Sequence, residues 1–206
     1  INPNTDTRAE EAIFSENIFV SANNVTIDGI MFTGAARLMG GETGCSDVVI
    51  KNVWSKGSTV NPAAENSGTA PFYFYSSTEG VVFKNLTFFQ IRMSDRTDGR
   101  PMAMVLGRVE NLTIKDSQFV GKRSNYNDAI KLGNDGSGFG VKGNVEIVGC
   151  HFENFAQYVL WFLHYSEGTY SIQNNTFLNC GQTSSAHCAI RFADYAGADA
   201  GLSSIE

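Results

Sequence analysis

Residues 112–121 read LTIKDSQFVG, and this ten-residue pattern decides the fold because five other stretches of the chain repeat it. The other copies are VTIDGIMFTG (25–34), VVIKNVWSKG (48–57), VVFKNLTFFQ (81–90), VEIVGCHFEN (145–154) and YSIQNNTFLN (170–179). Successive copies begin 23 to 33 residues apart. A period of this size is typical of solenoid proteins, in which each repeat forms one coil that must stack on its neighbours.

Each column of the repeat has a physical cause. The first and third positions are apolar in nearly every copy, and this period of two predicts a strand that buries alternate side chains. The fifth position is filled by Gly29, Asn52, Asn85, Asp116, Gly149 and Asn174. These residue types tolerate a left-handed backbone, so we expect a sharp bend there. The eighth position is Phe in five of six copies, which predicts a second short strand that buries the ring.

Further apolar runs between the copies predict a third strand in each coil. They are PFYFY (71–75), MAMVL (102–106), DAIKLG (128–133), YVLWFL (158–163) and CAIRFA (188–193). Three parallel strands per coil predict an all-β, right-handed parallel β-helix of about six to seven coils over residues 1–206. Because solenoids need capped ends, and the final LSSIE is no cap, we expect this single domain to be part of a longer chain with flanking domains.

Composition and charge limit the classes of function that this chain can have. The chain has 206 residues, of which 42% are hydrophobic, and no apolar run approaches the roughly 20 residues of a membrane span. The net charge is −6, but residues 84–131 hold nine of the fifteen Lys and Arg and only five Asp and Glu. An acidic chain with a basic middle argues against nucleic-acid binding and favours a local site for an anionic ligand. Scattered surface charge is the alternative interpretation.

The four cysteines follow no zinc-site spacing. Cys150 occupies a repeat position that otherwise holds small or apolar residues, so we expect a buried free thiol. Cys180 and Cys188 flank a seven-residue loop, and the sequence leaves open whether they form a disulfide.

The repeats resemble those of the pectate-lyase-like superfamily of parallel β-helices over nearly the whole chain. The resemblance implies that the interposed strands line a substrate groove and that the loops after the Phe strands border it. Those loops, QIRMSDRTDGRP (90–101) and GKRSNYND (121–128), carry much of the basic charge. The candidate substrate-binding residues are Arg92, Arg96, Arg100, Lys122, Arg123, Tyr126 and Trp161.

Aromatic side chains that face outward would add a platform on which sugars stack. Alternation places either Tyr73 and Tyr75, or Phe72 and Phe74, on the outside of PFYFY. Trp161 faces out if its two neighbours face in.

Polysaccharide lyases of this superfamily remove a proton beside a uronate carboxylate, which requires a base and a neutralising cation. Alternation points Lys131 out of AIKLG and Arg191 out of CAIRF, while His164 follows the strand between them. We therefore expect Lys131, His164 and Arg191 to form one catalytic column, with Lys131 or His164 as base and Arg191 or Arg123 as neutraliser. Three ordinary surface residues are the alternative.

Two narrower resemblances bear on the chemistry. NDAIKLGND is partly similar to the D-D-x-I-x-I-K-S-G segment of polygalacturonases, whose other motifs are absent from this chain. Residues 127–133, 145–155 and 170–180 are more similar to coils of chondroitinase-B and alginate-lyase-like proteins, which implies a Ca²⁺ cofactor with Asp128 as candidate ligand. That family carries its acids and catalytic lysine on the strand that here reads AQYVLWFLHYSEG (156–168), whose only basic residue is His164.

Two functions follow. The first is a secreted or cell-surface, bacterial protein that engages an acidic, uronate-containing polysaccharide or a cell-surface glycan and cleaves it by β-elimination. The second is a non-catalytic β-helix module that binds glycan, acts as an adhesin or forms a structural surface element.

Overall fold

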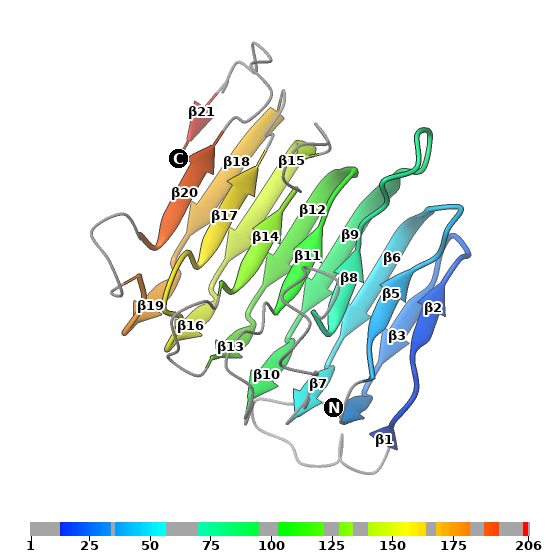
Figure 1. The fold of residues 1–206 in the computed structure, drawn as a ribbon, viewed down its shortest axis with the longest axis horizontal. Coiled ribbons are helices and arrows are strands. Elements are labelled where there is room, and N and C mark those ends of the chain that lie inside the picture. The colour runs from blue at the N-terminus through cyan, green and yellow to red at the C-terminus, as the bar shows by residue number, and fades with distance from the viewer. Residues whose placement is uncertain are drawn as a thin grey trace.

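The computed structural model describes residues 13–33, 36–56, 70–94, 103–121, 128–133, 140–163, 168–181, 188–193 and 204–205. These residues form strands arranged in three parallel seven-stranded sheets. Figure 1 shows the strands of each sheet side by side along the long axis of the molecule. The fold is a right-handed parallel β-helix of about six to seven coils, which confirms the predicted fold class.

Each coil contributes one strand to each sheet, in the order sheet A, sheet B, sheet C. Sheet A contains β1 (Ile13–Phe14), β4 (Met31–Thr33), β7 (Trp54–Lys56), β10 (Arg92–Ser94), β13 (Gln118–Val120), β16 (His151–Glu153) and β19 (Thr176–Leu178). Sheet B contains β2 (Ile18–Val20), β5 (Leu38–Gly40), β8 (Phe72–Phe74), β11 (Met104–Leu106), β14 (Ile130–Leu132), β17 (Leu160–Leu163) and β20 (Ile190–Ala193). Sheet C contains β3 (Thr26–Asp28), β6 (Cys45–Lys51), β9 (Phe83–Phe89), β12 (Val109–Lys115), β15 (Val141–Val148), β18 (Gly168–Gln173) and β21 (Ser204–Ile205).

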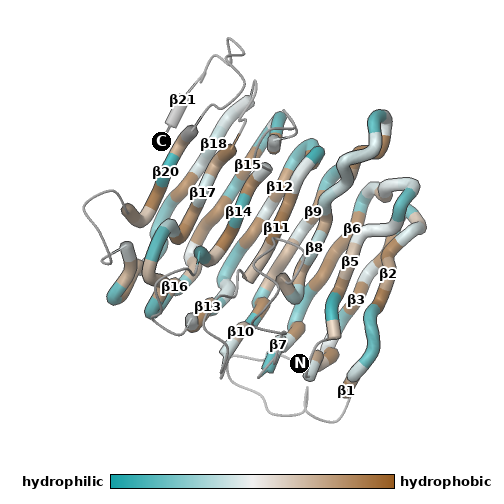
Figure 2. The backbone as a smooth tube through the Cα atoms, in the orientation of Figure 1, coloured by the Kyte–Doolittle hydropathy of each residue, from teal (hydrophilic) through white to brown (hydrophobic). Residues whose placement is uncertain are grey.

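The core fills the space enclosed by the three sheets. Hydrophobic segments recur from strand to strand along the helix (Figure 2). Phe88 of sheet C packs edge-to-face against Phe72 and Phe74 of sheet B, with ring centroids 6.1 and 5.8 Å apart. On sheet A, Phe152 stacks between Phe119 and Phe177 at 5.2 and 5.3 Å. The rings at equivalent positions of successive coils therefore form continuous columns inside the helix.

The predicted alignment of the third repeat, residues 81–90, is wrong by five residues. Leu86, not Val81, pairs with Val48, and Phe88 pairs with Ile50. Met93 of β10, rather than Phe88, therefore occupies the sheet A column of Ser55 and Phe119. The cause is the length of β9, whose two halves both carry the apolar alternation that defines the repeat.

The bend between sheets C and A behaves as the repeat predicts. The bend residue has a positive φ in each coil: Gly29, Asn52, Gln90, Asp116, Gly149 and Asn174. Gln90 takes this place in the third coil, where Asn85 was expected. The Asn52 side-chain amide donates a hydrogen bond to Asp28 Oδ1 at 2.6 Å, which links two successive bends.

Asn85 belongs to a different column, in the first half of the sheet C strands. Asp47, Asn85, Asn111 and Gly143 all have positive φ there. Asn85 donates to Asp47 Oδ1 at 2.8 Å, and Asn111 donates to Asn85 Oδ1 at 2.9 Å. We refer to Asp47, Asn85 and Asn111 as the asparagine ladder. Its hydrogen bonds pair the polar side chains of three successive coils at the point where the backbone leaves regular strand geometry.

All four cysteines are free thiols in this structure. Cys150 is buried, as the repeat predicts, and its sulfur lies 3.6 and 3.5 Å from the carbonyl oxygens of Ile114 and Val148. The Cys180 thiol is directed to the carbonyl oxygens of Phe152 and Leu178. None of the described residues forms a helix with the length and apolarity that crossing a bilayer requires.

The neighbours Phe88 and Phe89 offer a matched test of the core. Phe88 is fully buried among aromatic rings, whereas Phe89 lies on the outward side of β9 and is half-buried. Phe88→Ala is expected to lower the free energy of unfolding by about 3–5 kcal/mol because it leaves a cavity. Phe89→Ala is expected to cost at least about 2 kcal/mol less. Urea unfolding followed by circular dichroism measures both, and equal losses would contradict the assigned faces.

Thiol labelling tests the burial of the cysteines. Burial raises the pKa of the Cys45 and Cys150 thiols to about 11, so both remain protonated at pH 8. Cys188 is exposed. With iodoacetamide under native conditions, Cys188 is expected to react at least about tenfold faster than Cys45 and Cys150, because the thiolate is the nucleophile. Mass spectrometry of the labelled peptides provides the rates, with denatured protein as the control for full reactivity.

Candidate functional site

The second residue of each sheet B strand faces away from the core. Seven such residues stand in register from one end of the sheet to the other: Phe19, Met39, Tyr73, Val105, Lys131, Trp161 and Arg191. The residues on both sides of Lys131, Ile130 and Leu132, belong to the hydrophobic core, as do those on both sides of Trp161. Alternation therefore directs this column outward. We call it the outer column of sheet B.

The outer column brings together part of the predicted catalytic set. Lys131 and Arg191 occupy it as expected, separated by Trp161, which also faces out as expected. His164 lies outside the described residues. The open question about PFYFY resolves in favour of tyrosine, because Phe72 and Phe74 are fully buried in the core and Tyr73 lies in the outer column.

Four side chains at this end of sheet B form a cluster of cations and aromatic rings. The Lys131 ammonium lies 4.8 Å from the centroid of the Trp161 ring. The Arg191 guanidinium lies 4.7 Å from the Tyr158 ring and 5.7 Å from the Trp161 ring. Arg191 Nη1 also donates a hydrogen bond to the Tyr158 hydroxyl, and the Tyr158 and Trp161 rings are 5.0 Å apart. We refer to Lys131, Tyr158, Trp161 and Arg191 as the cation–aromatic cluster.

The cluster differs in exposure from residue to residue. Lys131 is only 4% exposed although its column faces outward, whereas Trp161 and Arg191 are half-buried. The Trp161 indole nitrogen is buried and has no hydrogen-bond partner among the residues that the structure describes. One buried cation, one half-buried cation and a buried N–H donor therefore lie within a few ångströms of one ring. This arrangement favours a negatively charged or strongly hydrogen-bond-accepting group.

Asp128 helps to hold the backbone that carries the cluster. Its carboxylate is buried, and Oδ1 accepts the backbone N–H of Tyr158 at 2.9 Å. Asp128 therefore helps to fix the corner that carries Tyr158. Within the described ranges, no three His, Cys, Asp or Glu side chains gather closely enough to hold a metal ion.

Among the other predicted binding residues, Arg92 is described by the structure, and it does not join the cluster. Arg92 lies on β10 of sheet A, where its guanidinium is 4.3 Å from the Trp54 ring. Trp54 is nearly fully buried and donates its indole N–H to Ser94 Oγ at 2.9 Å. The remaining predicted residues lie outside the described part of the chain: Arg96, Arg100, Lys122, Arg123 and Tyr126.

Sequence reasoning missed Tyr158 because alternation fails at the corner before β17. Val159 and Leu160 are consecutive, yet both belong to the core. The chain therefore turns inward over two residues, and Tyr158, which is 7% exposed, lies beside Arg191 and apart from the core cluster. One coil earlier, the consecutive residues Ala129 and Ile130 also both belong to the core. This recurrence of two adjacent apolar residues before the strand could have predicted the position of Tyr158.

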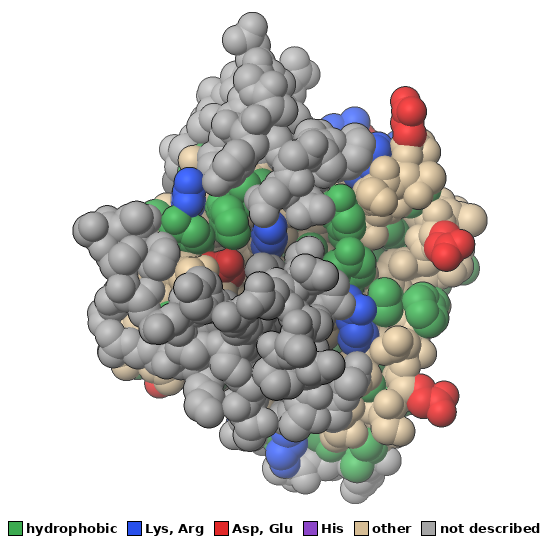
Figure 3. Space-filling view, in the orientation of Figure 1, with side chains coloured by type: hydrophobic (Ala, Val, Ile, Leu, Met, Phe, Trp, Pro, Cys, Tyr) green, Lys and Arg blue, Asp and Glu red, His purple; other side chains and the backbone are tan. Residues whose placement is uncertain are grey.

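The space-filling view shows the surroundings of sheet B, whose strands lie toward the viewer in Figure 1. On the part of this face that is described, basic side chains lie next to hydrophobic ones, and acidic side chains are also present, one of them close to the central basic side chain (Figure 3). The cations therefore lie partly against apolar surface, where each is less screened than it would be in open solvent.

Comparison with known proteins does not identify a family for this chain. Neither protein-family models nor curated proteins nor solved structures give a match to this chain.

A double-mutant cycle tests the contact between Arg191 and Tyr158. Tyr158→Phe removes the hydroxyl acceptor and Arg191→Gln removes the charge. The two changes are expected to be coupled by about 1 kcal/mol in the free energy of unfolding, because each of them removes one partner of the same hydrogen bond. Tyr158→Phe combined with Lys56→Gln, on sheet A, is the control pair and should be additive. A coupling no larger than that of the control would contradict the cluster.

Proposed function

We propose that this chain engages an acidic, uronate-containing polysaccharide at the cation–aromatic cluster. The observation that carries the proposal is the position of Trp161 between two cations in one outward column. A pyranose ring stacks on an indole through its C–H groups, and its carboxylate is attracted by a cation beside the ring. The half-buried Arg191 supplies the planar fork that pairs with carboxylates in a bidentate manner.

The burial of Lys131 favours binding over catalysis. A general base must come within hydrogen-bond reach of the proton that it removes. The Lys131 ammonium instead lies over the Trp161 ring, in a side chain that is 4% exposed. In this position it adds positive potential beneath the sugar without contacting the carbon that would lose a proton.

β-Elimination is the second candidate function, and the pairing of Arg191 with Tyr158 favours it. In that reaction a base takes the proton beside the carboxylate, a C=C bond forms and the glycosidic C–O bond breaks, and the leaving oxygen takes a proton. Arg191 would neutralise the carboxylate and the developing enolate. His164 is then the expected base in place of Lys131, whose ammonium lies over the Trp161 ring, and the Tyr158 hydroxyl is a further acid–base group next to the Arg191 cation.

The repeat pattern and the parallel β-helix support placing the chain in the pectate-lyase-like superfamily, and with it at the cell surface or in the secreted fraction. This assignment is part of the proposal. Calcium would assist the elimination by neutralising the carboxylate, a role that Arg191 can fill without it.

Calorimetric titration with oligogalacturonate and oligomannuronate tests the binding proposal. The double variant Lys131→Gln/Arg191→Gln is expected to weaken binding at least about tenfold, and added salt should weaken binding to the wild-type protein. The control is Lys51→Gln/Lys142→Gln, which removes the same charge from exposed positions of sheet C. Equal weakening in both double variants would mean that net charge alone attracts the glycan and would contradict the assigned site.

Ultraviolet absorbance of the same mixtures separates the two candidate functions. New unsaturated ends would establish elimination, and Arg191→Gln and Tyr158→Phe would then assign the roles. Binding without any rise in absorbance, with and without Ca²⁺, would leave the non-catalytic module.

A further inference from the structure

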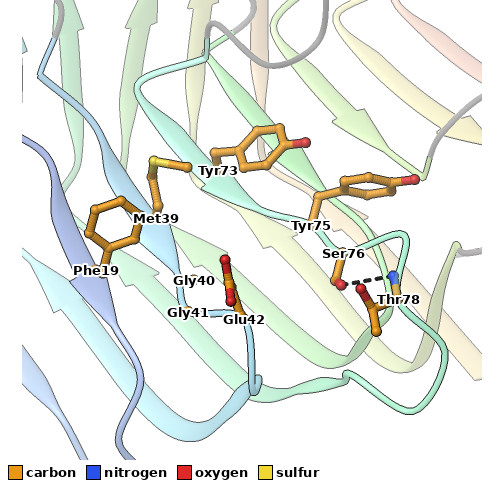
Figure 4. Close-up of a pocket in the computed structure, with 9 residues that line it drawn as sticks. All are labelled: Phe19, Met39, Gly40, Gly41, Glu42, Tyr73, Tyr75, Ser76 and Thr78. Carbon is orange, nitrogen blue, oxygen red and sulfur yellow. Dashed lines mark hydrogen bonds between the residues drawn. The ribbon is translucent and has the colours of Figure 1, made fainter.

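A groove of about 490 Å³ lies toward the other end of sheet B (Figure 4). Its apolar walls come from the outer column, where Phe19, Met39 and Tyr73 are successive members, and from Tyr75. Phe19 is 61% exposed, so one wall is a bare aromatic surface. The groove is separate from the cation–aromatic cluster because Val105, which lies between Tyr73 and Lys131 in the outer column, is fully buried.

The two tyrosines form a rigid platform. Their ring centroids lie 5.9 Å apart in an edge-to-face arrangement. The Arg37 guanidinium lies 4.7 Å from the centroid of Tyr73, and Arg37 is itself held by a hydrogen bond from Nε to the carbonyl of Ala70 at 3.0 Å. Burial, with a further contribution from Tyr75, raises the pKa of the Tyr73 hydroxyl. The hydroxyl therefore stays protonated at neutral pH and can donate as well as accept a hydrogen bond.

The rim of the groove is polar. Glu42 contributes an exposed carboxylate from the turn after β5. Ser76 and Thr78 contribute hydroxyl groups from the segment after β8, where Ser76 Oγ accepts the Thr78 N–H at 3.0 Å. The Ser76 carbonyl accepts a hydrogen bond from Arg108 at 3.1 Å, which fixes this segment against the next coil. Aromatic walls with a carboxylate and hydroxyl groups at the rim match the apolar faces and vicinal hydroxyls of a sugar.

The charges around the groove select an uncharged ligand. Among the described residues that line it, Glu42 is the one with a formal charge at neutral pH, and its carboxylate repels an anionic sugar. Arg37 lies against the Tyr73 ring, so the positive charge of Arg37 and the negative charge of Glu42 offset each other and favour a ligand without net charge. We infer that the groove is a second and independent carbohydrate site, which binds an uncharged hexose residue. This inference extends the proposed function from one class of sugar to two, at separate places on sheet B.

Saturation-transfer NMR and calorimetry with methyl glycosides of glucose, galactose and mannose test this site. At least one of these glycosides is expected to bind the wild-type protein. Tyr73→Ala and Glu42→Gln should each weaken its binding at least about fivefold, because the first removes the stacking surface and the second replaces a charged hydroxyl acceptor with a weaker, neutral amide. The matched controls are Phe89→Ala, on the outside of sheet C, and Glu79→Gln, in the same segment as Thr78; both should bind as the wild-type protein does.

Three results would overturn the inference: no binding of any neutral glycoside, equal weakening in the controls, or preferential binding of methyl glucuronoside or choline in the groove. Glu42→Gln changes an exposed turn residue and leaves the tyrosines in place, so its result does not depend on Tyr73→Ala folding normally. Arg191→Gln separates this inference from the proposed function. It should weaken uronate binding and leave neutral glycosides unaffected, so that either site can fail while the other is retained.

Discussion

The hydrogen-bonded register between successive coils is the constraint on which the rest of the structure depends. Each strand pairs in parallel with the strand one coil away, so the strand residues of the inner coils have equivalents in the coil on each side. A residue type that suits one coil at a buried or bend position often suits its neighbours, and columns of Phe and of Asn result. The asparagine ladder and the Phe119–Phe152–Phe177 stack are two consequences of the same register.

The same constraint builds the functional surface. Outward side chains do not have to fit the packing of the interior, so their types can vary. They are nevertheless aligned from coil to coil, because the same strand register aligns the inward side chains. Tyr73, Lys131, Trp161 and Arg191 share one column although more than a hundred residues separate the first from the last. A rigid scaffold of this kind holds stacking rings and cations in place before a ligand arrives, which reduces the entropic cost of binding.

The fold could be predicted from the sequence because its determinants are local and repeated. A period of two, a left-handed bend residue and a buried Phe are each visible within ten residues. The third coil was misaligned because Phe83 and Phe88 lie in one strand, and either could serve as the apolar anchor. Alternation also predicted that Lys131, Trp161 and Arg191 face outward.

What the sequence could not predict depends on contacts between distant segments. Lys131 is outward yet almost inaccessible, which no pattern within one strand reveals. Tyr158 approaches Arg191 because the chain turns inward twice at a corner, which interrupts the alternation. The groove at Tyr73 is lined by strands from three successive coils and by the turn that carries Glu42. These segments are spread along the sequence, so no single stretch of it predicts the groove.

The register of the outer column also sets a unit of length. Tyr73 and Trp161 are three strands apart, and each step along the sheet is about 4.8 Å. The separation of the two ends of sheet B can therefore change only in whole steps, by gain or loss of an entire coil. A shorter or longer relative of this chain would keep the chemistry at each end and differ in span. In such a solenoid, the number of coils sets the length of a ligand that can reach both ends of the sheet.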